Sequence, residues 1–353
     1  MPMTIVSVAY PLAPVRPDAV GGAEHVLLQL DRALVRAGHR SVVVACTGSR
    51  VAGKLAAFDI PRSYEADVLP TAEKRVRKIV ANLVRDAAVD LVHIHALDFS
   101  AVSPSEATPT LVTLHLPRSY YAETDLRRPP PNLWLNCVSR AQSTSFADVK
   151  NIVATIENGV RIVRRGPAPA HARSFAVWFG RICPEKAPHL AIEAAMKANA
   201  PLVLAGRAFP YPTHLGYFES HIAAHLGPRC RFVGPVGGAC KRTLLRHARC
   251  LIVSSQAPET SSLAAREALA SGTPVVAFRT PALEQLIEHG VTGFLVGDNR
   301  EMAAAIRSVS ILDPRACIRA AKLRCNESDM TSGYLQLYET LRSRVREPAR
   351  ALA

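Results

Sequence analysis

The sequence predicts an α/β protein made of two Rossmann-like domains, each a doubly wound parallel sheet, that face a central cleft. Strand and helix patterns alternate from one end of the chain to the other, with no block of consecutive strands, which is typical of parallel α/β architecture. A length of 353 residues corresponds to about two domains, and 48% hydrophobic with 20% charged residues is a globular composition.

The first half of the chain opens with a short apolar strand over Thr4–Ala9, followed by a loop that ends in Gly21-Gly22. Apolar residues then recur at helical spacing from Val26 to Ala37, and Gly38 ends this helix. Polar residues follow the strands at their carboxyl ends, where open α/β sheets place ligands. The other elements expected in this half are a strand over Ser41–Cys46, a helix around Val76–Val84, and strands over Asp90–His95, Thr110–His115 and Asn132–Val138.

A stretch with the composition of a linker separates the two halves. Residues 161–173 contain prolines and alternating alanines. We therefore expect an N-terminal domain over residues 1–160, a linker over 161–173 and a C-terminal domain over 174–329. The final helix, in residues 330–353, has an apolar face that needs a surface to cover, so we expect it to pack back across the domain junction.

The second half repeats the alternation of strands and helices. We expect strands over Phe175–Phe179, Leu202–Ala205, Arg231–Val233, Leu251–Ser254, Pro274–Phe278 and Gly293–Val296. We expect helices over His189–Ala198, Thr213–Leu226, Lys241–Ala248, Ser262–Ala270, Ala282–His289, Met302–Val309 and Pro314–Arg324.

The net charge of +14 raises the possibility of a nucleic-acid partner, but the excess is spread over both halves of the chain. The densest run, Lys74–Lys78, lies within a helical pattern and is read as a solvated helix face, with at most weak contact to a membrane surface. No apolar run approaches the ~20 residues of a membrane span. Eight cysteines without a Cys-x-x-Cys pair indicate free thiols and a cytoplasmic location.

Two strand-to-helix loops carry groups suited to an anion. Gly21-Gly22 can leave backbone N–H groups free at a helix N-terminus, although an unliganded tight turn explains these glycines equally well. Arg181 and Lys186 lie five positions apart in the second loop and could reach one ligand from two sides, or could simply be solvated.

The segment from Glu259 to Gly272 supplies two acidic side chains and a helix N-terminus that could form a binding site together with these cations. Ser261 or Ser262 can cap a helix that Gly272 ends, which places Glu259 before the helix and Glu267 inside it. At ~1.5 Å per residue, the two acids fall on either side of the capping N–H groups. This spread suits a nucleotide sugar, with phosphates at the helix N-terminus, ribose near Glu267 and the sugar near Glu259. A capped helix with two solvated acids is the competing interpretation.

Metal and cofactor motifs are missing from the sequence. No Asp-x-Asp is present, which removes the usual carboxylate clamp for a catalytic Mg²⁺ or Mn²⁺. His93 and His95 are expected on opposite faces of their strand, unable to share a metal. We therefore expect no metal and no cofactor.

These motifs together resemble the retaining glycosyltransferases of the GT-B fold, family 4 (group 1). The resemblance rests on the Gly21-Gly22 loop, His115, Arg181 with Lys186, and above all the Glu259-x7-Glu267 frame that runs into Gly272. It implies transfer of a hexose from a nucleoside diphosphate sugar, such as a UDP-sugar, to a small-molecule, glycan or lipid-linked acceptor with retention. The N-terminal domain would take the acceptor and the C-terminal domain the donor.

The resemblance also implies individual roles. Arg181 and Lys186 would contact the donor diphosphate, Glu267 the ribose and Glu259 the transferred sugar. His115 and the Gly21-Gly22 loop would close from the N-terminal domain. The donor-binding group would further include Thr260, Ser261, Ser262 and Leu263. The amino-acid sequence of this segment is similar to sequences labelled as bacterial pterin glucosyltransferases.

Two departures from the family pattern keep other functions open. Thr260-Ser261-Ser262 replaces Gly-Phe-Gly, so the glycine that gives closest backbone approach to a phosphate is missing. Thr280-Pro281-Ala282-Leu283 stands where many members have Gly-Gly before a glutamate. A sugar-nucleotide epimerase of the same fold and a non-catalytic partner that binds nucleotide sugars are the alternatives.

Overall fold

The computed structural model describes residues 2–61, 64–65, 67–105, 107–162 and 168–351. The chain divides into two compact units. The first comprises Met1–Glu157 with Ser328–Ala353, and the second comprises Asn158–Glu327. Among the described residues, no helix combines the length and the apolar composition that crossing a bilayer requires.

The first unit contains a seven-stranded, entirely parallel sheet in the order β3-β2-β1-β4-β5-β6-β7. Apolar runs form its central strands because both faces of a parallel sheet are covered, and all four residues of β4 are buried. The strands are β1 Thr4–Val8, β2 Arg40–Cys46, β3 Lys54–Phe58, β4 Leu91–Ile94, β5 Thr110–Leu114, β6 Leu133–Cys137 and β7 Ile152–Thr155. The helices are α1 Gly22–Arg36, α2 Val68–Asp86, α3 Phe99–Val102, α4 Glu123–Arg127, α5 Arg140–Thr144 and α13 Glu327–Ala351.

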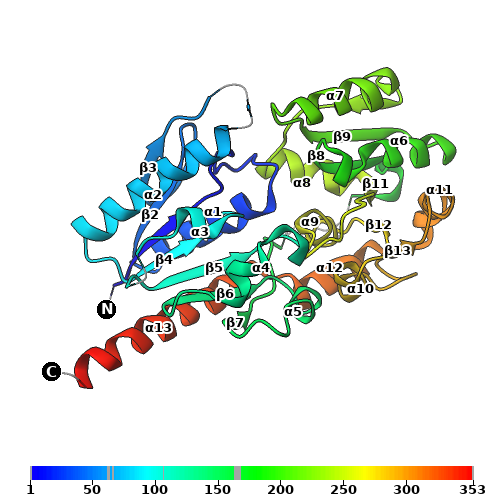
Figure 1. Ribbon diagram of the computed structural model, residues 1–353. Coiled ribbons are helices and arrows are strands. Elements are labelled where there is room, and N and C mark those ends of the chain that lie inside the picture. The colour runs from blue at the N-terminus through cyan, green and yellow to red at the C-terminus, as the bar shows by residue number, and fades with distance from the viewer. Residues whose placement is uncertain (1, 62–63, 66, 106, 163–167, 352–353) are drawn as a thin grey trace. The chain divides into compact units, whose positions relative to one another are not determined.

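The second unit contains a six-stranded parallel sheet in the order β10-β9-β8-β11-β12-β13 (Figure 1). Ala176 and Trp178 of β8 belong to one buried cluster and Val177 to another, so both faces of the sheet are covered. The strands are β8 Phe175–Arg181, β9 Leu202–Arg207, β10 Cys230–Phe232, β11 Ala248–Val253, β12 Val275–Phe278 and β13 Gly293–Val296. The helices are α6 Pro188–Lys197, α7 Pro212–His221, α8 Gly238–His247, α9 Leu263–Ala270, α10 Pro281–Leu286, α11 Asn299–Ser308 and α12 Pro314–Arg324.

Both sheets follow the doubly wound strand order, and this confirms the predicted fold class. The order reverses between β1 and β4 in the first unit and between β8 and β11 in the second. Such a reversal sends the following loops to opposite sides of the sheet, so ligands of open α/β proteins bind there. Strands β3 and β7, at the two edges of the first sheet, were missing from the sequence-based prediction.

The chain enters and leaves the second unit through one short paired segment. The N–H of Val160 donates to the carbonyl of Cys325 at 2.7 Å, and the N–H of Glu327 donates to the carbonyl of Val160 at 3.2 Å. A β-carbon at Gly159 would collide with the Asn326 backbone, so this close approach requires glycine. Residues 163–167 of the predicted linker lie outside the described residues, while Arg173 at its end donates to the carbonyl of Gly272 at 2.9 Å.

The C-terminal helix α13, red in Figure 1, belongs to the first unit from Ser328 onward. Its Tyr334 and Tyr338 are fully buried. Tyr334 shares hydrogen bonds with Thr113 of β5 and Asn136 of β6, and Tyr338 bonds to His93 of β4. The helix is therefore anchored to the sheet by polar as well as apolar contacts.

Candidate functional site

The loops after β8 and β11 meet at the point where the strand order of the second sheet reverses. The N–H of Gln256, after β11, donates to the carbonyl of Glu185, after β8, at 2.8 Å. The Ser254 hydroxyl donates to the carbonyl of Ala187 at 2.8 Å and accepts from the indole N–H of Trp178 at 3.2 Å. These bonds tie the two loops together and to the core of the sheet.

The first loop carries the predicted cations. Arg181 is the last residue of β8, and Lys186 ends a single 3₁₀ turn over Pro184–Lys186. Ala187 has a left-handed backbone with φ of 45° and is fully buried, and helix α6 begins at the next residue. An alanine held in this conformation is strained, which indicates that the surrounding contacts determine the path of the turn.

The second loop places Glu259 against Lys186. The Lys186 ammonium lies 2.5 Å from Oε1 of Glu259, and the Ser255 hydroxyl donates to the same oxygen at 2.5 Å. The Glu259 side chain is 9% exposed and that of Lys186 is 30% exposed. Burial acts to raise the pKa of Glu259, but the Lys186 charge and the hydrogen bonds from Lys186, Ser255 and Ser262 outweigh it and lower the pKa. Glu259 is therefore an ionised, tightly held carboxylate.

Ser262 lies at the N-cap position of α9, but its side chain does not cap the helix, contrary to the prediction. Its φ is 47°, and its side chain makes no hydrogen bond to the helix N–H groups. The hydroxyl bonds to Glu259 instead. Ser261 is also buried, and its hydroxyl and carbonyl both accept from Arg266 at 3.1 Å. Side-chain capping by either serine is thus wrong, because the Ser262 hydroxyl bonds to Glu259 in the loop and the Ser261 hydroxyl bonds to the Arg266 side chain of α9.

Glu267 lies on α9 and forms an ion pair with Lys241 of α8. The Lys241 side chain is 12% exposed, and its ammonium also lies 5.3 Å from the centre of the Phe179 ring. The ammonium does not have hydrogen-bond geometry toward Oε2 of Glu267, which has no hydrogen-bond partner among the described residues. Lys241 had not been identified from the sequence, because no motif joins it to a glutamate 26 positions away.

The predicted glycine loop of the first unit is occupied by the protein's own carboxylate. Gly21 precedes α1, and Glu24, in the first turn of that helix, is 5% exposed. A β-carbon at Gly21 would meet Oε2 of Glu24, so a larger residue here would displace the end of the Glu24 side chain, whereas the Gly21 φ of −83° is open to any residue. An anion at this turn would meet the negative charge of Glu24.

His115 follows β5 and belongs to a buried histidine cluster. Its Nε2 lies 2.9 Å from Nδ1 of His95, and the two rings stack. Burial lowers the pKa of His115 to about 3 and holds the pKa of His93 and His95 well below the ordinary range. All three imidazoles are therefore neutral at pH 7.

The prediction that His93 and His95 point to opposite faces is wrong. Their ring centres are 4.1 Å apart, because side chains two positions apart in an extended segment lie on the same face. His93 bonds through Nδ1 to the Tyr338 hydroxyl and through Nε2 to the Thr113 hydroxyl, each at 2.7 Å. The role of His93 is thus to anchor α13.

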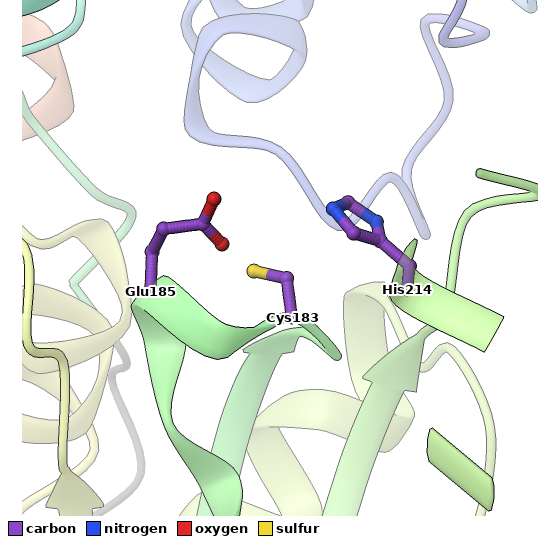
Figure 2. A group of neighbouring side chains, drawn as sticks. All are labelled: Cys183, Glu185 and His214. Carbon is purple, nitrogen blue, oxygen red and sulfur yellow. The ribbon is translucent and has the colours of Figure 1, made fainter. Parts of the chain in front are cut away.

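Three side chains that can act as metal ligands lie close together in the second unit, two in the turn after β8 and one in α7. Figure 2 shows Cys183 between Glu185 and His214, with its sulfur directed toward the Glu185 carboxylate. One ligand atom from each residue lies within 4.8 Å of the others. The sequence did not indicate this group, since His214 comes from α7 and the set has no Cys-x-x-Cys spacing.

Two family models match the chain in succession. "Glycosyltransferase Family 4" matches residues 20–178, and "Glycosyl transferases group 1" matches residues 173–310. The second match contains Arg181, Lys186, Glu259 and Glu267.

Curated relatives with similar sequences carry the name D-inositol 3-phosphate glycosyltransferase. The protein from Salinispora tropica is 36% identical over an alignment of 166 residues that covers 43% of this chain and 34% of the relative. The protein from Salinispora arenicola is 32% identical over an alignment of 225 residues that covers 53% of this chain and 49% of the relative. The matches thus span between a third and half of the length of these relatives.

Two solved structures share the fold over nearly the whole chain. Anabaena HepE in complex with UDP and glucose has a TM-score of 0.70 at 22% identity, covering 97% of this chain and 100% of the other. AviGT4, a glycosyltransferase involved in avilamycin A biosynthesis, has the same TM-score and identity and covers 97% of this chain and 98% of its own.

Proposed function

The chain belongs to the family 4 glycosyltransferases of the GT-B fold, and on this premise we propose that it moves a hexose from a UDP-sugar to an acceptor hydroxyl with retention of configuration. The proposal rests on one observation. Lys186 and Glu259 form a hydrogen-bonded ion pair in the loops that follow β8 and β11, where the strand order of the second sheet reverses. A cation and an ionised carboxylate at that edge match the two needs of a nucleotide sugar, a charged diphosphate and a polar sugar.

Glycosyl transfer leaves negative charge on the departing diphosphate and positive charge on the sugar. Arg181 and Lys186 supply fixed positive charge for the diphosphate, as a metal does in other enzymes. Glu259 supplies fixed negative charge for the sugar end, and its Lys186 and serine partners keep it ionised during turnover. Since these groups are already oriented before the donor binds, little reorganisation is required in the transition state.

Glu267 is assigned to the ribose. Its Oε2 is paired with the Lys241 ammonium, but a carboxylate has about four acceptor positions, so it keeps acceptor capacity for a sugar hydroxyl. Lys241 forms an ion pair with this carboxylate, and its ammonium lies over the Phe179 ring. These two contacts of Lys241 fix the orientation of the Glu267 side chain on α9. Thr260, Ser262 and Leu263 would line the donor side of the same turn, and Ser261 would act through Arg266.

In the first unit, His115 would contact the transferred sugar as a neutral hydrogen-bonding group. Its low pKa excludes a role as a cationic acid near pH 7. In retaining transfer without a protein base, the acceptor hydroxyl gives its proton to the leaving phosphate on the same face of the sugar. Relatives named D-inositol 3-phosphate glycosyltransferase and a relative structure containing UDP and glucose support a UDP-sugar donor and a hydroxyl acceptor.

The experiment that tests this proposal measures release of nucleoside diphosphate by the purified protein. UDP- and GDP-sugars are offered with and without a panel of polyol, glycan and lipid-linked acceptors, and the anomeric configuration of the product is read by NMR. Acceptor-dependent UDP release with a retained anomer supports the proposal. Isomerised free UDP-sugar would show an epimerase, and donor binding without turnover would show a non-catalytic partner.

A further inference from the structure

Cys183, Glu185 and His214 form a compact cluster that the proposed transfer reaction does not use. Cys183 and Glu185 flank Pro184 in the turn after β8, and His214 is the third residue of α7. Their ligand atoms lie within 4.8 Å of one another, and Figure 2 shows the three side chains as neighbours in the second unit.

Two atoms of the cluster are buried without a hydrogen-bond partner among the described residues. They are Nδ1 of His214, whose residue is only 9% exposed, and Oε2 of Glu185. A buried nitrogen or carboxylate oxygen without a partner is costly and uncommon in native structures, and a bound ion is one of the few arrangements that satisfies it. Cys183 is fully buried as well, so its sulfur is not placed to attack a substrate from solvent.

The donor set identifies the class of ion. A thiolate, an imidazole and a carboxylate together suit Zn²⁺, whereas Mg²⁺ and Ca²⁺ prefer oxygen ligands alone. A tetrahedral zinc ion with bonds of about 2.0–2.3 Å holds its ligand atoms about 3.5 Å apart. Ligand atoms within 4.8 Å of one another can reach that spacing by small rotations of the side chains.

We propose that Cys183, Glu185 and His214 bind one Zn²⁺ ion, with solvent as the fourth ligand. Binding adds two positive charges and releases one proton from the Cys183 thiol to solvent, so the turn gains one net positive charge. This turn begins directly after Arg181 and ends at Lys186. The ion would therefore tie the turn that carries Arg181 and Lys186 to α7, and it would make the local electrostatic potential more favourable for an anion. This consequence for the donor rests on the proposed function, whereas zinc binding itself does not.

Metal binding is tested on the full chain after treatment with a chelator and its removal. Co²⁺ is titrated as a spectroscopic substitute for Zn²⁺, and competition with a chromophoric chelator gives the zinc affinity. We expect one ion per chain, a thiolate-to-cobalt charge-transfer band and a higher Tm when Zn²⁺ is present. Cys183→Ser should abolish the band and weaken zinc binding by more than the roughly 10–100-fold that loss of an outer-shell partner costs.

Matched controls keep the result interpretable. Cys240→Ser changes an exposed thiol of the same unit and should leave the band and the affinity unchanged. His214→Gln should weaken zinc binding as Cys183→Ser does, and the Tm of each metal-free variant reports whether it is folded. Absence of a band in the wild-type protein, or equal zinc affinity in wild type and a folded Cys183→Ser variant, would overturn the proposal.

The link to the donor is measured separately. If the ion positions Arg181 and Lys186, Zn²⁺ should lower the Kd for UDP in wild type and have no effect in Cys183→Ser. Zinc binding without any change in UDP affinity would remove this consequence and leave the metal site intact. UDP binding and transfer without zinc binding would overturn the metal site and leave the proposed function intact.

Discussion

We expect Lys186→Met to destabilise the second unit by about 3 kcal/mol, because it leaves the Glu259 carboxylate buried without its cation. The carboxylate lies 2.5 Å from the ammonium and is 9% exposed. Removing one partner of a buried pair costs about 3–5 kcal/mol, and the 30% exposure of Lys186 and the remaining hydroxyls of Ser255 and Ser262 favour the lower end of this range. The buried Glu259 carboxylate therefore depends on Lys186 for its charge compensation.

The reverse substitution, Glu259→Gln, should cost only about 1–2 kcal/mol. Lys186 is 30% exposed, so its ammonium can turn toward water once its partner is neutral. The double variant should be less destabilised than the sum of the single variants, with a coupling free energy of about 2 kcal/mol. The low pKa of Glu259 implies that this coupling is complete above its unfolded pKa of about 4.3 and is lost as the pH falls through its lower, folded pKa.

The two tryptophans allow each unit to be followed on its own. Trp134 lies in β6 of the first unit, and Trp178 lies in β8 of the second, 2% exposed and bonded to Ser254. In a Trp134→Phe background, urea unfolding monitored by fluorescence reports the second unit alone. As a control, Arg279→Met breaks an exposed ion pair to Glu284 in the same unit and should change the free energy of unfolding by less than about 0.5 kcal/mol.

Additivity of the two single substitutions within about 0.5 kcal/mol would refute the reasoning, because it would mean that Lys186 and Glu259 do not stabilise each other. A coupling energy that stays constant from pH 7 to pH 3 would also refute it, since protonation of Glu259 must remove an electrostatic interaction.

Three further outcomes are expected. Because burial lowers the pKa of His93, His95 and His115, these three side chains gain protons below about pH 6.5 only in the unfolded chain, and the first unit should lose stability there; burial raises the pKa of Glu73 to about 7, which acts in the opposite direction, so equal urea midpoints at pH 7.5 and pH 5 in a Glu73→Gln, Trp178→Phe background would contradict this. Tyr338→Phe leaves Nδ1 of His93 without its partner and should destabilise the first unit by about 1–3 kcal/mol in the same assay, whereas an unchanged midpoint would show that the bond does not anchor α13. Chelation should not abolish transfer at saturating donor, because no Asp-x-Asp clamp for a catalytic metal is present; a kcat that is lost and then restored by Mn²⁺ would disprove metal-independent chemistry.

The fold was predictable because buried parallel strands and amphipathic helices have distinct periods. The apolar runs of β1, β2 and β5 and the strand β13, Gly293–Val296, were identified close to their observed bounds. The edge strands β3 and β7 were missed because they are short and mostly not fully buried, so their sequences lack the apolar run of central strands.

The site was only partly predictable, since side-chain partners depend on packing between helices. Arg181, Lys186, Glu259 and Glu267 were chosen from loop position and spacing, and the structure pairs Lys186 with Glu259. Lys241 reaches Glu267 from α8, and periodicity says nothing about that contact. The serine side chains before α9 were misassigned as caps because the left-handed backbone of Ser262 and the side-chain partners Glu259 and Arg266 are not visible in the sequence pattern.

The most direct test of the donor assignment compares Glu259→Gln with Glu267→Gln in steady-state kinetics of UDP release from UDP-glucose. A ribose contact is uniform between ground and transition states, so Glu267→Gln should raise the donor KM about tenfold and keep kcat. Glu259 opposes charge that develops only during transfer, so Glu259→Gln should lower kcat by about 100-fold or more with little change in KM. Folded variants that both turn over like the wild type would contradict the account.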